Sequence, residues 1–117
     1  MITGIGLDVV ELSRIRRLDA KSSKFRQRIL TEYEQVEYNQ LTAKRKVEFL
    51  AGRFAAKEAF SKANGTGIGG DCSFQDIEIR KDDKGKPSVY FQRIETGLVS
   101  ITHSKEFAAA QVLLQTN

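Results

Sequence analysis

Apolar residues alternate with small or polar ones over the first ten positions, and this period of two predicts a β-strand over residues 2–10. One face of that strand would carry Thr3, Ile5, Leu7 and Val9. The other face would carry Gly4, Gly6 and Asp8. We therefore expect one carboxylate to lie on a strand face that is otherwise nearly free of side chains.

Helical periodicity replaces the alternation after this strand. Apolar residues at helical spacing predict a short amphipathic helix with arginines on its opposite side: Leu12, Ile15 and Leu18. A second helical segment is expected over residues 22–30, and Thr31 with Glu34 forms a capping box for a third, through Leu41. Strong helix formers then run from Ala43 to Asn64, and Gly65 stands where a C-terminal cap belongs, which predicts one long central helix.

The second half of the chain has strand patterns. Residues 74–81 and 88–92 predict a hairpin around the turn "DDKGKP", and residues 98–103 and 107–115 predict a final strand pair. Helices followed by antiparallel strands favour an α+β fold over alternating βαβ units. The 117 residues have the size of one domain, so we expect a single domain over 1–117.

Composition narrows the class of protein. No apolar run approaches the roughly 20 residues that span a bilayer, and the first ten residues lack a basic region, so we expect a cytoplasmic protein without a signal peptide or membrane contact. The lone Cys72 suits a reducing compartment. The basic charge is local: residues 13–28 hold seven Lys/Arg and one acid, Asp19, which indicates an acidic partner.

Two carboxylates stand out as candidates for chemistry. Glu58 shares a helical arc with Leu50, Ala51 and Phe54, where a packing surface is expected. It forms either an ordinary i,i+4 pair with Lys62 or part of a functional site. Asp8 either caps the next helix together with Glu11 or binds a hard cation. If strand and helix pack together, Asp8 and Glu58 could hold Mg²⁺, which needs only one or two protein carboxylates beside phosphate and water.

Two further features admit both a structural and a functional interpretation. The glycine-rich segment "NGTGIGG" follows a helix, so it is neither a Walker A loop nor a dinucleotide fingerprint. It is either a C-cap with a flexible turn or a loop whose amides, with Lys62, hold phosphate oxygens. His103, the only histidine, ends an apolar strand. It is either an ordinary hydrogen-bonding residue or a hydrogen-bond donor to a phosphate.

Four segments together resemble one family across essentially the whole chain: "GIGLDVVELSRI" (4–15), "FLAGRFAAKEAFSKANGTGIG" (49–69), "FQDIEIRKDDKGKP" (74–87) and "VSITHSKEFAAAQV" (99–112). They resemble the holo-[acyl-carrier-protein] synthases, the small bacterial 4'-phosphopantetheinyl transferases. The resemblance implies the 4'-phosphopantetheinyl transferase fold and a Mg²⁺-dependent enzyme of fatty acid biosynthesis. Such an enzyme transfers the phosphopantetheine arm of coenzyme A to a serine of apo acyl carrier protein and releases adenosine 3',5'-bisphosphate.

The resemblance also implies roles for individual residues. Asp8 and Glu58 would be the metal ligands and, with Lys62, the catalytic residues. Coenzyme A would be bound by Lys62, by the turn of Gly65, Thr66 and Gly67, and by Arg45, Arg53, His103 and Ser104 at its adenine and 3'-phosphate end. Carrier docking would use a basic and apolar set: Arg14, Leu18, Lys21, Lys24, Phe25 and Arg28. Family members are typically trimers with cofactor sites between subunits, and the general base stays open.

One segment departs from the family pattern, and two other functions compete. Residues 88–98 look shortened, which puts a local helix or loop there in doubt. A basic nucleic-acid-binding module would explain the Arg/Lys run, but it lacks a recognition motif and interleaved aromatic residues. A silent scaffold of the same fold would not need the intact Asp8, Glu58 and Lys62. We therefore expect the transferase and no nucleic-acid partner.

Overall fold

A computed structural model describes residues 1–116. Along this range the elements are β1 (Ile2–Glu11), α1 (Leu12–Lys21), α2 (Lys24–Ile29), α3 (Glu32–Asn39), α4 (Ala43–Asn64), the 3-10 turn η1 (Phe74–Asp76), β2 (Ile77–Lys81), β3 (Pro87–Phe91), β4 (Ile94–His103) and β5 (Phe107–Gln115). The predicted α+β order is confirmed. The third helix ends at Asn39, two residues earlier than expected. Among the described residues, no helix is both long and apolar enough to cross a membrane.

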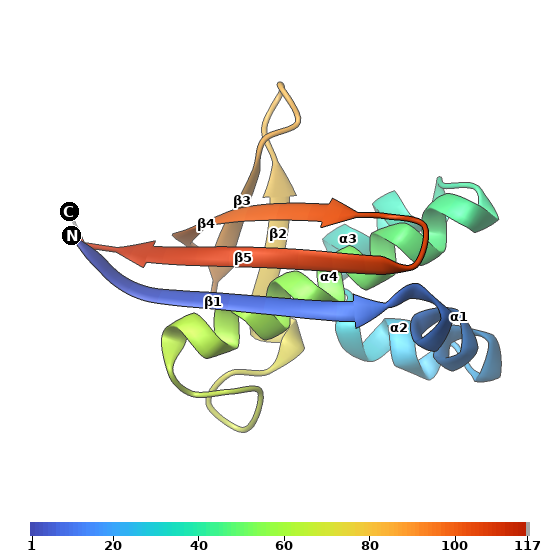
Figure 1. Ribbon diagram of the computed structural model, residues 1–117, viewed down its shortest axis with the longest axis horizontal. Helices are drawn as coiled ribbons and strands as arrows, with labels where there is room; N and C mark the ends of the chain where they lie inside the picture. Colours follow the sequence, from blue (N-terminus) through green and yellow to red (C-terminus); the bar gives the residue numbers. More distant parts are fainter. Residues whose placement is uncertain (117) are drawn as a thin grey trace.

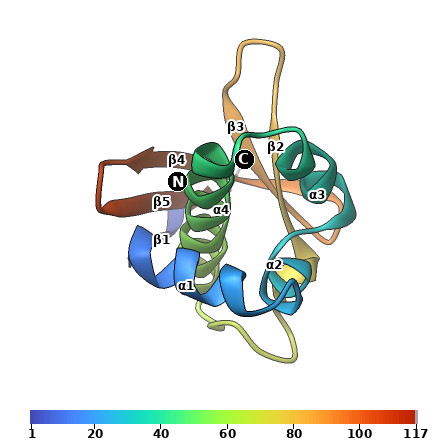
Figure 2. The same cartoon turned by 90° about the vertical axis from the view of Figure 1, so that its right-hand side faces the viewer.

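The strands of residues 1–116 form one antiparallel sheet in the order β1-β5-β4-β3-β2. The first and last strands pair, so the two ends of the chain lie side by side (Figure 1). The long helix α4 packs mainly on β1 and β5. Turned by 90°, the molecule shows α4 between β1, β4 and β5 on one side and α2 and α3 on the other (Figure 2).

Glycines allow β1 to approach α4 unusually closely. A Cβ atom on Gly4 would lie 2.2 Å from the Ala63 carbonyl oxygen, and one on Gly6 would lie 1.9 Å from that of Ala59. The strand and helix backbones therefore meet without side chains between them. Asp8 lies on this same face of β1, which brings its carboxylate next to α4.

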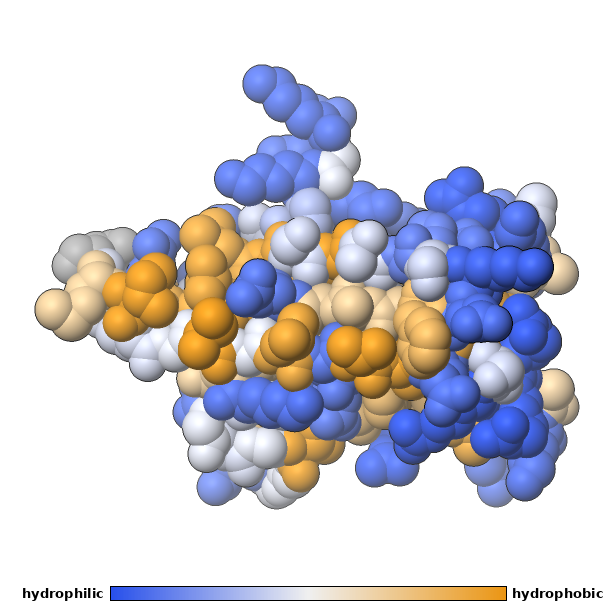
Figure 3. Space-filling model, in the orientation of Figure 1, coloured by the Kyte–Doolittle hydropathy of each residue, from blue (hydrophilic) through white to orange (hydrophobic). Residues whose placement is uncertain are grey.

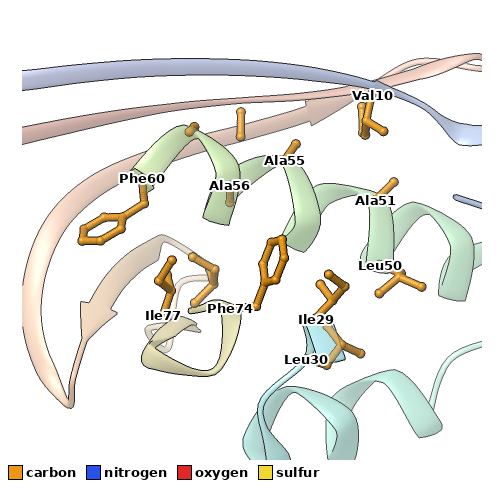
Figure 4. Close-up of a cluster of buried hydrophobic side chains, with 14 of the residues drawn as sticks. Val10, Ile29, Leu30, Leu50, Ala51, Ala55, Ala56, Phe60, Phe74 and Ile77 are labelled. Atoms are coloured by element: carbon orange, nitrogen blue, oxygen red, sulfur yellow. The ribbon is translucent and has the colours of Figure 1, made fainter. Parts of the chain in front are cut away.

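The core lies on both sides of α4. Figure 4 shows Val10 on one side of the helix and Ile29, Leu30 and Ile77 on the other. The helix begins where the Thr42 hydroxyl accepts a hydrogen bond from the Arg45 amide, and it ends at Gly65 in the left-handed conformation, as predicted. The capping box of Thr31 and Glu34 is also confirmed.

Two basic side chains of α4, Arg53 and Lys57, are buried rather than exposed. Lys57 is fully buried, and its Nζ lies 2.6 Å from Glu34 Oε1. Burial lowers the pKa of Lys57, and the Glu34 carboxylate partly opposes that shift. Arg53 is 4% exposed. These two cations therefore join α4 to neighbouring elements inside the protein.

The doubtful segment 88–98 is a tight β-hairpin. The strands β3 and β4 are joined by Gln92 and Arg93, which have φ values of 50° and 72°. Two adjacent residues of positive φ are typical of a two-residue hairpin turn. The strand β4 begins at Ile94, four residues before the predicted start.

The face of the sheet that does not contact α4 is rich in exposed apolar residues. Ile5, Leu7 and Val9 of β1 are 61%, 58% and 58% exposed, and Leu98 and Phe107 of the neighbouring strands are also exposed. Figure 3 shows hydrophobic residues gathered along the middle of the molecule in this view. The alternation of β1 was predicted correctly, but its glycine face, and not its apolar face, packs against the helix.

Candidate active site

Asp8, Glu58 and Lys62 form an acidic corner where β1 meets α4. Lys62 Nζ lies 3.2 Å from Asp8 Oδ1 and donates a 3.0 Å hydrogen bond to the Leu7 carbonyl oxygen. Burial raises the pKa of Glu58, and the nearby Asp8 charge raises it further, whereas Lys62 opposes the shift. The helix α1 begins at Glu11 without any side-chain cap. The capping role of Asp8 is therefore wrong, and Lys62 pairs across to Asp8.

The donor set of this corner fits a hard divalent cation. Two carboxylates on adjoining elements face one another closely enough for one to raise the pKa of the other. They therefore favour added positive charge, which the Lys62 ammonium supplies only in part. Within residues 1–116, no group of three or more His, Cys, Asp or Glu side chains could hold a metal. A two-carboxylate site that leaves positions for phosphate oxygens and water suits Mg²⁺ better than Zn²⁺.

The glycine turn after α4 has its amides already engaged. The amides of Gly65, Thr66 and Gly67 all donate to the Ser61 carbonyl oxygen, at 3.1, 3.2 and 3.1 Å. The C-cap interpretation is confirmed. In this conformation a phosphate at the turn would have to be held by side chains, of which Lys62 is the charged one.

A second group of predicted residues lines a pocket of about 280 Å³ between α4, β2 and β4, which we call the anion pocket. Arg45, Arg53 and His103 come together there. The Arg53 guanidinium lies 4.2 Å from the centre of the Phe49 ring, and its Nη2 is 3.9 Å from Glu37 Oε1. Arg53 Nε and Nη2 are buried without a hydrogen-bond partner. Burial lowers the pKa of this guanidinium. An anion in the pocket would both accept hydrogen bonds from the unpaired nitrogens and favour the charged form of Arg53.

Glu48 lies between the other two predicted residues of this pocket, Arg45 and His103. Its carboxylate oxygens lie 3.5 Å from Arg45 Nε and 3.5 Å from His103 Nε2. Ser104 is not in this pocket but in an adjoining groove, which His103 lines as well. The Ser104 hydroxyl accepts a 3.2 Å hydrogen bond from the Phe107 amide, so it shapes the turn between β4 and β5.

The predicted docking residues lie on α1 and α2, next to the acidic corner. Phe25 packs against Phe54, with ring centres 6.0 Å apart, and Arg14 lies over the Phe54 ring at 5.9 Å. Arg28 lies over the Phe74 ring at 5.6 Å. Arg14 and Arg28 both oppose the rise in the pKa of Glu58, which places this basic surface within reach of the carboxylates. Lys21 and Lys24 are exposed, and Leu18 is half-buried.

The sequence analysis missed several residues of these sites. Phe54 and Phe74 form the apolar floor beneath the docking arginines, and Glu37, Phe49 and Lys81 line the anion pocket. Apolar spacing identified Phe54 only as a packing residue. Phe49 lies four residues from both Arg45 and Arg53 in α4, so helical spacing could have identified it. Glu37, Phe74 and Lys81 come from other elements, so no spacing along the chain signals them.

The acidic corner and the anion pocket lie on different sides of α4. Glu58 follows Arg53 by five residues, which rotates it by about 140° around the helix. The charges that shift the pKa of Glu58 are those of Asp8, Lys62, Arg14 and Arg28. Those that shift the pKa of Arg53 are on Glu34, Glu37 and Tyr33. Within one chain, α4 therefore separates the acidic corner from the anion pocket.

Comparison with known proteins gives a consistent result over the whole chain. The model of the 4'-phosphopantetheinyl transferase superfamily matches residues 4–113. The holo-[acyl-carrier-protein] synthase of Bacillus subtilis (strain 168) is 58% identical over 98% of this chain and 97% of its own. That of Geobacillus kaustophilus (strain HTA426) is 56% identical over 98% and 90%.

Solved structures agree in fold. The crystal structure of a holo-(acyl-carrier-protein) synthase from Bacillus anthracis str. Ames, in complex with CoA (3',5'-ADP), has a TM-score of 0.89 at 53% identity, covering 100% of this chain and 99% of that one. The Helicobacter pylori synthase in complex with coenzyme A has a TM-score of 0.82 at 36% identity, covering 95% and 99%. This chain belongs to the holo-[acyl-carrier-protein] synthase family of the 4'-phosphopantetheinyl transferase superfamily.

Proposed function

We propose that residues 1–117 act as one 4'-phosphopantetheinyl transferase domain, which transfers the phosphopantetheine arm of coenzyme A to a serine of apo acyl carrier protein. The family assignment over the full chain carries this proposal. Two structural relatives are described in complex with CoA or coenzyme A, which supports coenzyme A as the donor. The acidic corner and the anion pocket supply the chemistry that this reaction needs.

The reaction joins the serine oxygen to the β-phosphorus and breaks the bond from that phosphorus to adenosine 3',5'-bisphosphate, which leaves with the bonding electrons. It needs alignment and charge neutralisation more than covalent help from the protein. Asp8 and Glu58 would hold Mg²⁺, which when bound neutralises the diphosphate and leaving group. Lys62 would exchange its contact with Asp8 for a diphosphate oxygen. Water oriented by Asp8 and Glu58 would accept the serine proton.

The anion pocket suits the 3'-phosphate end of coenzyme A. Arg53 offers two buried nitrogen atoms that lack a hydrogen-bond partner, and Arg45 and His103 line the same pocket. An entering phosphate would accept hydrogen bonds from the guanidinium and give Arg45 and His103 a partner besides Glu48. Ser104, in the adjoining groove, would contact the same nucleotide from the side.

We infer that one complete site takes its two halves from two copies of the chain. Because α4 separates Glu58 from Arg53, a single extended coenzyme A would otherwise have to pass around the helix. The exposed apolar face of Ile5, Leu7 and Val9 supplies a surface that copies could bury. These features support a homotrimer with sites between subunits.

A subunit-mixing experiment tests the shared site. Glu58→Gln and Arg53→Met chains are each impaired, but in a mixed oligomer one copy supplies Glu58 and its neighbour Arg53. Equal random mixing restores about one quarter of the sites in a cyclic oligomer. Transfer activity measured at limiting coenzyme A should therefore rise well above that of either parent. No recovery after verified subunit exchange would place both halves in one chain.

The basic surface of α1 and α2 would receive the carrier protein. Arg14, Lys24 and Arg28 provide charge for an acidic partner, and Phe25 provides an apolar contact between them. Their nearness to Glu58 would bring the carrier serine to the diphosphate.

The decisive experiment is the intact mass of an apo acyl carrier protein after incubation with this protein, coenzyme A and magnesium. The expected result is a gain of one phosphopantetheine group, which is lost in a parallel sample with chelator. Modification that persists with chelator would contradict the metal role. No gain with several apo carriers would contradict the transferase and leave a silent scaffold or a nucleic-acid-binding module, which a duplex-binding titration separates.

A further inference from the structure

The C-terminal end of α2 is completed by residues from distant parts of the chain. This helix has only six residues, too few to be stable alone. The last carbonyl groups of a helix lack partners within it. In α2 the Leu30 amide donates to the Arg26 carbonyl oxygen, at 2.8 Å. The following carbonyl groups need partners from outside the helix.

Gln75 and Lys57 supply those partners. The Gln75 side-chain nitrogen lies within hydrogen-bonding distance of three carbonyl oxygens: those of Gln27 at 2.9 Å, Arg28 at 3.1 Å and Leu30 at 2.8 Å. The Ile29 carbonyl oxygen accepts a 2.7 Å hydrogen bond from Lys57 Nζ. The carbonyl groups of residues 27–30 thus all lie against a side-chain donor from η1 or α4, and Gln35 Nε2 of α3 also donates to the Leu30 oxygen, at 3.1 Å.

The contacts of Gln75 and Lys57 with the carbonyl groups of residues 27–30 are called the clamp below, and Lys57 connects it to the acidic corner. Its Nζ also donates to the Phe74 carbonyl oxygen, at 3.0 Å, next to Gln75 in η1. Lys57 directly precedes Glu58 in α4. The same turn of α4 therefore anchors α2 and presents Glu58, which fixes the position of the docking helix relative to the carboxylates.

We propose that Gln75 is a positioning residue for the transfer reaction. By capping α2 from another segment, it holds Lys24, Phe25 and Arg28 in the arrangement that the carrier protein meets. This inference rests on the proposed function, because it concerns the docking surface named there. An ordered docking helix saves the carrier the cost of ordering it on binding.

The chemistry of the cap is specific to a hydrogen-bond donor. The primary amide points its nitrogen at carbonyl oxygens, so a side chain of similar length without N–H groups leaves those of Gln27 and Arg28 without a protein donor, whereas that of Leu30 keeps its hydrogen bond from Gln35. Gln75→Met keeps length and neutrality but removes the donors. Gln75 lies at the surface, whereas Lys57 is fully buried and its substitution would disturb the core. Gln40→Met is the matched control, because Gln40 is also exposed and lies outside the clamp.

The test combines steady-state kinetics with hydrogen exchange. For Gln75→Met we expect the KM for apo carrier to rise about five- to tenfold, as the loss of one or two net hydrogen bonds implies, with the KM for coenzyme A changed less than about twofold. The rise should persist at high salt, because no charge is altered. Amide exchange should accelerate more in residues 24–30 than in the strands of the sheet, and the melting temperature should fall by only a few degrees.

Three outcomes would overturn the proposal. Unchanged exchange in residues 24–30 would show that Gln75 does not hold α2; this measurement needs no carrier, so it is independent of the transfer reaction. An unchanged carrier KM beside active wild-type protein would show that α2 order is irrelevant to docking. Equal rises in both KM values, or the same change in Gln40→Met, would indicate a general structural effect.

Discussion

Replacement of Arg53 by methionine should change stability and ligand affinity in opposite directions. In the protein the guanidinium is buried, lies over the Phe49 ring and leaves Nε and Nη2 without partners. Methionine has a similar length and no polar hydrogen atoms, so it can fill the same space against Phe49 without those unpaired groups.

The opposing contributions can be compared. Each buried unpaired donor costs about 1–3 kcal/mol, whereas the contact with the Phe49 ring contributes about 0.5–2 kcal/mol. The Glu37 carboxylate, at 3.9 Å from Nη2, adds a charge interaction without a hydrogen bond. Because two such nitrogens together cost more than the ring contact contributes, Arg53→Met should leave the free energy of unfolding unchanged or raise it by up to about 4 kcal/mol.

The affinity for the nucleotide should fall at the same time. Hydrogen bonds to a charged group contribute about 1.5–3 kcal/mol, so their loss weakens binding by about 10- to 150-fold. Calorimetric titration with adenosine 3',5'-bisphosphate should show this loss. Titration with 5'-AMP, which lacks the 3'-phosphate, should change far less. Arg17→Met, on the exposed part of α1, is the matched control and should alter neither affinity nor stability.

Two results would refute this reasoning. A loss of more than about 2 kcal/mol in unfolding free energy would mean that the guanidinium is a structural group whose contacts outweigh its unpaired donors. Equal weakening for both nucleotides would mean that Arg53 does not meet the 3'-phosphate.

Three further substitutions test the acidic corner and the docking surface. Glu58→Gln should abolish transfer and weaken Mn²⁺ binding, measured by electron paramagnetic resonance; turnover like that of the wild type would remove Glu58 from the site. Folding raises the pKa of Glu58, so this side chain stabilises the fold at a pH below its unfolded pKa, and that contribution is lost as the pH rises through its folded pKa. At neutral pH, metal-free Glu58→Gln should therefore unfold at the same temperature as the wild type or at a higher one. Lys62→Met removes a half-exposed partner of Asp8 and should tighten Mn²⁺ binding by about two- to fivefold while weakening coenzyme A; looser Mn²⁺ binding would contradict competition at Asp8. Reversal of Arg14 and Lys24 to glutamate should raise the KM for the carrier and reduce its salt dependence, with coenzyme A binding unchanged; an equal loss of both would assign these residues to the fold or the nucleotide site.

The elements that the sequence predicted well are those with local causes. The capping box of Thr31 and Glu34, the C-cap at Gly65 and the hairpin around residues 82–87 each depend on neighbours within a few positions. The acidic corner was predicted from Asp8 and Glu58 through a family resemblance, and the structure places the two carboxylates near each other.

The burial of charged side chains could not be predicted in the same way. The spacing of residues along α4 contains no information about α3 or η1, whose residues contact Arg53 and Lys57. Lys57 is buried only because Glu34 and the carbonyl groups of Ile29 and Phe74 surround it, and these lie 17 to 28 residues away. The amides of residues 65–67, in contrast, donate to the end of α4, as the C-cap interpretation of the glycine turn predicts from neighbouring residues alone.

The absence of side chains determines the acidic corner as much as the carboxylates do. Gly4 and Gly6 let β1 approach the backbone of α4 at Ala63 and Ala59, and the next residue on that face is Asp8. A methyl group at Gly6 would lie 1.9 Å from the Ala59 oxygen, so the strand would have to move away from the helix. That movement would carry Asp8 away from Glu58, because the close approach at Gly4 and Gly6 sets the distance between β1 and α4. The small residues of β1 and α4 therefore act through distance: they bring two like charges close together, where the divalent cation that we propose would stabilise both.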